Sequence, residues 1–164
     1  AINAAVPGLW EKMGPDALEL WHQTGSAHID GVRASYPENL PAQVRVVPFI
    51  EDMQAAYAWA DVVVCRSGAL TVAELAVMGR PAILVPLPTA IDDHQNANAR
   101  ALTDVGAAKR LPQQDLSAEA LAAQLREWIA NPESLQAMAR ASFDSAIPDA
   151  ARRVSDLCEE LLHA

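Results

Sequence analysis

The segment from Cys65 to Pro86 constrains the fold most, because it combines the patterns of a strand end, a turn, a helix and a second strand. The apolar, β-branched run over 61–65 predicts a short strand that is buried on both faces of a parallel sheet. A Ser-Gly turn at 67–68 follows, and residues 70–78 have the composition of a helix, which the Gly-Arg-Pro sequence behind it would end. A helix that begins where a parallel strand ends directs its free N–H groups to the carboxyl edge of the sheet, where α/β proteins bind anionic ligands. The segment therefore predicts a phosphate or nucleotide site.

The rest of the chain alternates helical and strand patterns, which is typical of a doubly wound α/β domain. We expect further helices over 2–13, 26–35, 52–60, 93–105, 118–130, 133–146 and 149–162, and further strands over 18–22, 44–47, 82–85 and 108–111. Pro148 would bend the chain before the last helix. The expected organisation is one domain over 1–146, followed by a separate helix within 147–164. Four scattered tryptophans are expected to pack in the core: Trp10, Trp21, Trp59 and Trp128.

Size and composition exclude several classes of protein. With 164 residues and 51% hydrophobic content, the chain can bury one good core. The net charge of −9, with only 12 Lys and Arg residues, argues against a nucleic-acid surface. No apolar run approaches the roughly 18 to 20 residues that span a bilayer, and no signal-peptide pattern is present, so we expect a cytoplasmic protein. Cys65 and Cys158 have no metal-site spacing, and we expect both thiols to stay reduced.

Three stretches carry a resemblance to a known family: residues 49–86, 92–99 and 147–154. They are similar to the C-terminal half of the MurG family of GT-B glycosyltransferases, and the similarity extends from residue 21 through the last helix. The resemblance implies a Rossmann-like parallel sheet of the GT-B C-terminal domain. It also implies an activity, the transfer of N-acetylglucosamine from UDP-N-acetylglucosamine to lipid I. The product would be lipid II, a precursor in peptidoglycan synthesis and so in cell wall biogenesis, cell shape and cell division.

The resemblance also implies parts that this sequence lacks. In the family, a strand and a glycine-rich loop precede the helix that matches residues 2–13, and an acceptor domain precedes both. That domain would bind lipid I, supply the catalytic histidine and place the full-length protein on the cytoplasmic face of the inner membrane. We therefore expect no catalytic residue in this chain. Because the absent strand normally lies at the centre of such a sheet, either the sheet rearranges or another segment fills the gap.

The positions that match the family's donor site cluster after the expected strands. The resemblance assigns Glu74 to the two ribose hydroxyls, and a carboxylate can accept both hydrogen bonds. It assigns the backbone of Ile50 to the uracil edge, while backbone N–H groups near Gly68 would bind the diphosphate. The candidate donor-binding residues are Phe49, Ile50 and Met53 for the base, Ser67, Gly68, Ala69, Leu70, Thr71, Val72, Ala73 and Glu74 for the ribose and diphosphate, and His94, Gln95 and Asn98 for the sugar.

Each assignment has a plainer alternative. Glu74 would also favour the dipole of its helix, and Thr71 could cap that helix with its own hydroxyl. His94 stands where some family members have glutamine, so a solvated histidine at a helix start is an alternative to a sugar contact. A metal site at Asp92, Asp93 and His94 is disfavoured because no further ligands are evident. We expect neither a metal nor a cofactor.

Two other functions remain open from the sequence. One is a separate donor subunit of a two-chain UDP-N-acetylglucosamine transferase that works with a membrane partner. The other is a non-catalytic nucleotide-binding module. We favour the donor half of a longer enzyme, inactive by itself, because an intact bacterial chain would carry the glycine-rich loop.

Overall fold

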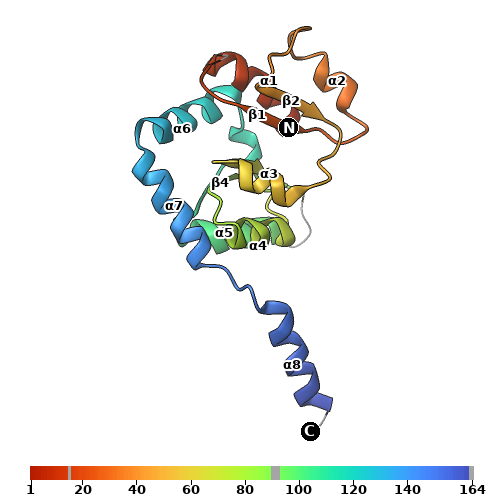
Figure 1. The fold of residues 1–164 in the computed structure, drawn as a ribbon, viewed down its shortest axis with the longest axis vertical. Helices are drawn as coiled ribbons and strands as arrows, with labels where there is room; N and C mark the ends of the chain where they lie inside the picture. The colour runs from red at the N-terminus through yellow and green to blue at the C-terminus, as the bar shows by residue number, and fades with distance from the viewer. Residues whose placement is uncertain (15, 90–92, 163–164) are drawn as a thin grey trace.

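Two small parallel sheets lie between layers of helices, and the structure, a computed structural model, describes residues 1–14, 16–89 and 93–162 (Figure 1). The first sheet pairs β1 (Leu20–Gln23) with β2 (Val44–Val47). The second sheet has the order β3 (Val63–Cys65), β4 (Ala82–Leu84), β5 (Ala108–Arg110), again with parallel pairs. The sequence prediction of an α/β fold with parallel strands is therefore confirmed.

The helices fall close to their expected ranges, with ends shifted by a few residues. They are α1 (Ile2–Met13), α2 (Ile29–Arg33), α3 (Met53–Trp59), α4 (Ala69–Val77), α5 (His94–Thr103), α6 (Ala118–Ala130), α7 (Pro132–Asp144) and α8 (Ala150–Leu162), with a short 3-10 turn at Gln113–Asp115. Local signals set several of these ends. The Ser117 hydroxyl accepts a hydrogen bond from the N–H of Ala120 at the start of α6, and Gly79 adopts a φ of 59° just after α4.

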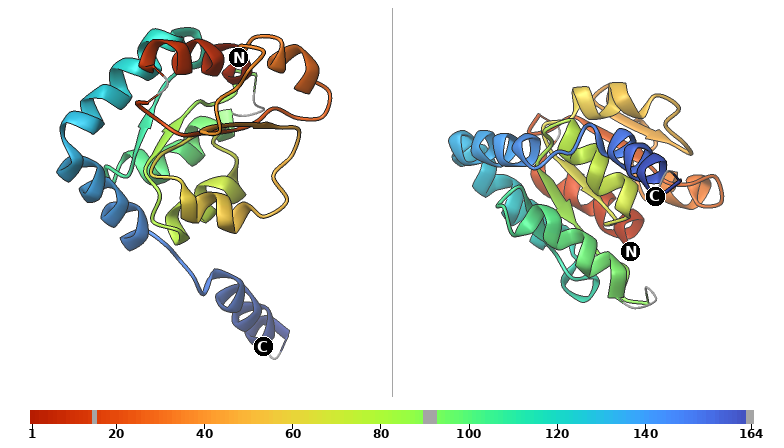
Figure 2. Two further views of the ribbon diagram at one scale, coloured as in Figure 1. Left: turned by 45° about the horizontal axis from the view of Figure 1, so that its top comes forward. Right: turned by 90° about the horizontal axis from the view of Figure 1, so that it is seen from below.

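Strand β4 is the best-buried strand, because helices cover both of its faces (Figure 2). Leu84 belongs to a cluster with Leu75 of α4, on the side of α3, α4 and α5. Ile83 belongs to a second cluster with Leu121 of α6, on the side of α1 and α6. Alternate side chains of one strand thus enter two cores, as expected for a doubly wound sheet.

A cleft separates the two sheets, and this corrects two expectations. Residues 63–65 are only half-buried, although the sequence predicted burial on both faces. The reason is that, in the described parts of the chain, β1 and β3 each have a neighbouring strand on one edge only: β1 pairs with β2, and β3 pairs with β4. The other edge of β1 and the other edge of β3 border the cleft, which has a volume of about 1140 Å³. The alternatives that the sheet rearranges or that another segment fills the gap are both wrong for the described residues, since the two sheets stay separate.

Amide hydrogen exchange is expected to report these open edges. The N–H groups of Leu20 and Thr24 donate toward β2, and that of Val63 donates toward β4. Because successive N–H groups of a strand point to opposite edges, the N–H groups of Trp21 and Val64 point toward the cleft. We expect these two amides to exchange faster than Leu20, Thr24 and Val63 by roughly tenfold or more, measured by NMR. Equal protection of both sets would contradict the open-edge geometry.

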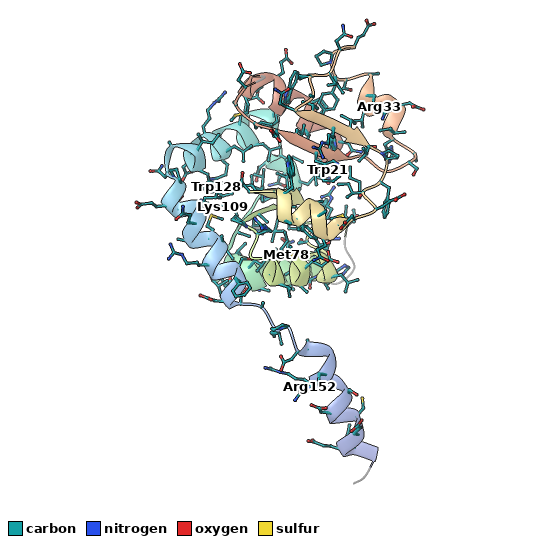
Figure 3. All side chains as sticks on the ribbon, viewed as in Figure 1. Trp21, Arg33, Met78, Lys109, Trp128 and Arg152 are labelled. Atoms are coloured by element: carbon teal, nitrogen blue, oxygen red, sulfur yellow. The ribbon has the colours of Figure 1, made fainter. Side chains whose placement is uncertain are left out.

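The tryptophans divide into two pairs, so the expectation of core packing holds for only two of them. Trp10 and Trp128 are buried. Trp21 of β1 and Trp59 of α3 instead meet edge to face, with ring centroids 5.9 Å apart, and Trp21 lies between the β1–β2 sheet and α3 (Figure 3). Both line the cleft, so their rings form part of its wall.

The last helix, α8, extends away from the body of the molecule in both views (Figures 1 and 2). Two exposed ion pairs at i, i+4 spacing lie along its first turns, Arg152 with Asp156 and Arg153 with Asp149, the residue just before the helix. Exposed pairs of this kind stabilise a helix only slightly. Among the described helices, none combines the length and the apolar composition that crossing a membrane requires.

Candidate functional site

The start of α4 follows the carboxyl end of β3 directly, as the sequence predicted. Gly68 is the N-cap residue, with extended backbone angles, and no side chain of the described residues caps the helix. The prediction that Thr71 could cap it is wrong, because Thr71 is the third residue of the helix, whereas a capping hydroxyl must precede the first turn. Within the described parts of the chain, the first N–H groups of the helix therefore have no capping side-chain acceptor.

Ser67, Gln95 and Asn98 come together beside this turn. Ser67 is fully buried, and its hydroxyl donates to the carbonyl oxygen of Gln95 at 2.8 Å. The side-chain amide of Asn98 donates to the carbonyl oxygen of Ser67 at 3.0 Å. The side-chain oxygen of Gln95 accepts a hydrogen bond from the N–H of Leu87 at 2.9 Å. These bonds attach the start of α5 to the turn before α4, so the two helix starts are held as one unit.

Glu74 lies about one turn along α4 and is exposed. Its Oε2 atom accepts a hydrogen bond from the hydroxyl of Tyr57 on α3 at 2.9 Å, and among the described residues the Glu74 carboxylate has no other hydrogen-bond partner. Burial, and then the hydrogen bond to Glu74, raise the pKa of Tyr57, so the phenol keeps its proton at neutral pH. Burial raises the pKa of the neighbouring Cys65 thiol to about 12, with a smaller contribution from the negative charge of Glu74. The two groups beside Glu74, the phenol and the thiol, therefore both keep their protons at neutral pH.

The expected base-binding residues lie between the end of β2 and the start of α3. Ile50 is buried, Met53 is half-buried and Phe49 is 64% exposed. The N–H of Ile50 donates to Oε1 of Gln23 at 2.8 Å. A base could bond to this N–H only after the exposed side chain of Gln23 moves aside. The backbone donor that the resemblance assigned to uracil is thus occupied in this structure.

The remaining predicted positions differ in their access to solvent. Ala69, Leu70, Ala73 and His94 are exposed. Val72 is buried in the core against Leu75, so its side chain cannot contact a ligand, and only its backbone remains available. Asp92 lies outside the described residues. Within the parts of the chain that are described, no group of three or more His, Cys, Asp or Glu side chains could hold a metal ion.

Three residues shape this region through partners that the sequence did not indicate: Tyr57, Gln23 and Arg66. The Arg66 guanidinium donates to the carbonyl oxygens of Val85 and Pro86 and to the side chain of Gln113, and so connects the carboxyl ends of the second sheet. Each of the three bonds to a residue on another element. No local pattern marks such contacts, so the sequence offered no signal for them.

Comparison with known proteins identifies a family. The family described as "Glycosyltransferase family 28 C-terminal domain" matches residues 1–154. A curated relative from Halorhodospira halophila is named UDP-N-acetylglucosamine--N-acetylmuramyl-(pentapeptide) pyrophosphoryl-undecaprenol N-acetylglucosamine transferase. It is 48% identical over 163 residues, which are 99% of this chain and 46% of that protein. The relative of the same name from Azotobacter vinelandii is 53% identical over 143 residues, 87% of this chain and 40% of that protein.

A solved structure agrees with these relatives. The crystal structure of Acinetobacter baumannii MurG matches with a TM-score of 0.84 and 40% identity, and covers 97% of this chain and 46% of that one. The chain thus spans about half the length of the relatives that it matches, and the resemblance drawn from the sequence is confirmed. With a family match over residues 1–154 and a solved MurG of the same fold, this chain belongs to glycosyltransferase family 28, of which it forms the C-terminal domain.

Proposed function

We propose that this chain binds the donor, UDP-N-acetylglucosamine, for a longer glycosyltransferase that converts lipid I to lipid II. The exposed Glu74 carboxylate near the uncapped start of α4 carries this proposal. The names of the two relatives support it, because each describes an N-acetylglucosamine transferase with an undecaprenol-linked acceptor. The acceptor and the cytoplasmic face of the membrane would be contacted by the rest of that longer protein. Nucleic acid is not a proposed partner, given the net charge of −9.

Backbone groups, rather than basic side chains, would bind the diphosphate. The chain is strongly acidic overall, so an anionic donor is repelled at long range. The N–H groups and the dipole at the start of α4 supply local positive potential at the carboxyl edge of the sheet. Glu74 would accept the ribose hydroxyls, uracil would replace Gln23 at the N–H of Ile50, and the sugar would extend toward His94 and Gln95.

The same groups would assist the transfer step. The C4 hydroxyl of the acceptor attacks the anomeric carbon, UDP leaves, and the configuration at that carbon is inverted. Negative charge develops on the leaving diphosphate, and the start of α4 would stabilise it without reorganisation. The general base would come from the part of the longer protein outside this chain.

Calorimetric titration of the chain with UDP tests this function. We expect a Kd between roughly 0.1 and 1 mM, because the site is open and half of the enzyme is absent. Uridine, which lacks the diphosphate, should bind at least about tenfold more weakly, since it cannot use the start of α4. UDP-N-acetylglucosamine should bind in the same range as UDP, with no sugar transfer to lipid I. Absence of UDP binding, or equal binding of UDP and uridine, would contradict the proposal.

A further inference from the structure

We propose that Tyr57 is a positioning residue of the donor site: its phenol holds the Glu74 carboxylate in the orientation that accepts the ribose hydroxyls. This inference rests on the proposed function and adds a residue to it. Tyr57 does not touch the donor in this proposal. It acts through Glu74 from the neighbouring helix α3, by the 2.9 Å hydrogen bond to Oε2.

The two partners differ in mobility, and this makes the hydrogen bond useful. Tyr57 is only 5% exposed and packs in the same cluster as Val72 and Leu75 of α4, so its ring has a fixed place. Glu74 is exposed on a long side chain with several accessible rotamers. A hydrogen bond from a fixed phenol restricts the carboxylate to the rotamers that keep Oε2 within reach. The side chain of Glu74 therefore loses its conformational entropy on folding, and not when the ligand binds.

The Glu74 carboxylate has enough hydrogen-bond acceptor positions for Tyr57 and for two ribose hydroxyls at once. A carboxylate offers about four acceptor positions on its two oxygens, and the phenol uses one of them on Oε2. Both positions on Oε1 and one on Oε2 remain, which suffices for two adjacent hydroxyls. The phenol and the Cys65 thiol are both neutral at physiological pH, so neither places a second charge beside Glu74.

A Tyr57→Phe variant tests the inference when two nucleotides are compared by calorimetry, UDP and 2′,3′-dideoxy-UDP. We expect the variant to bind UDP about five- to tenfold more weakly than the parent, because Glu74 must then be ordered on binding. Its affinity for the dideoxy nucleotide should be unchanged within about twofold, because that ligand has no hydroxyl for Glu74. Thermal unfolding of each protein shows whether it is folded.

Tyr36→Phe is the matched control. Tyr36 is also a buried tyrosine, 6% exposed, and its hydroxyl is hydrogen-bonded to Nδ1 of His22 at 2.9 Å. The variant makes the same chemical change away from Glu74. It should bind both nucleotides as the parent does.

Each other outcome overturns the inference. Unchanged UDP binding by Tyr57→Phe, with weakened binding by Glu74→Ala, would remove Tyr57 from the site and leave the proposed function intact. Equal weakening for both nucleotides would mean that Tyr57 acts only on the fold. A parent that does not bind UDP would contradict the proposed function itself. If Tyr57→Phe does not fold, Tyr57→Leu, which also removes the hydroxyl, is tested with the two nucleotides in the same way. Equal affinities for UDP in that variant and in the parent would contradict the inference.

Discussion

A Leu75→Ala variant is expected to lose about 3 to 4 kcal/mol of its free energy of unfolding. Leu75 is fully buried and packs in the cluster that contains Leu84 and Leu102, where α4 and α5 cover β4. The substitution removes buried apolar atoms and leaves a cavity that rigid neighbours fill only partly. Natural domains have only about 5 to 15 kcal/mol in total, so the variant should be near the limit of folding. Urea denaturation followed by circular dichroism measures the change.

The matched control for this effect is Leu70→Ala on the same helix. Leu70 is 80% exposed, so the same chemical change removes almost no buried surface. We expect a change in unfolding free energy within about 0.5 kcal/mol. Similar losses for the two variants would contradict the core assignment of α4.

The positions of helices and strands could be predicted because the signals that set them are local. Strand β2 and helices α1 and α6 have the bounds that the sequence indicated. The apolar spacing, the capping Ser117 and the glycine at 79 act over a few residues, so a linear sequence contains them in full.

Burial at the cleft could not be predicted from such signals. Val63 and Val64 are apolar and β-branched, and this composition predicts a buried strand, yet both are only half-buried. Composition shows which side chains favour burial, but it does not show which neighbour covers them. Trp21 and Trp59 deviate for the same reason, since they line the cleft instead of entering the core.

Some features of the candidate site could be predicted from the sequence, and others could not. The turn at Gly68 and the exposed Glu74 followed from the strand-turn-helix pattern together with the family resemblance. The contacts of Tyr57 with Glu74 and of Gln23 with Ile50 join residues that are 17 and 27 positions apart. Their partners depend on how α3 packs on α4 and how β1 pairs with β2, which only the folded chain defines.

A Glu74→Ala variant is expected to bind UDP about 50-fold more weakly than the parent, measured by calorimetric titration. Two hydrogen bonds from the ribose to a charged acceptor contribute about 1.5 to 3 kcal/mol each when they are well made, and the exposed setting reduces their sum. The sign of this effect is informative. Removing one negative charge from a chain with a net charge of −9 should by itself favour an anionic ligand, so a loss of affinity must come from a lost contact.

Glu133→Ala, at an exposed position in the first turn of α7, makes the same charge change away from the site. It should leave the affinity equal or slightly higher, and equal affinities for the parent and Glu74→Ala would exclude Glu74 from the ribose site.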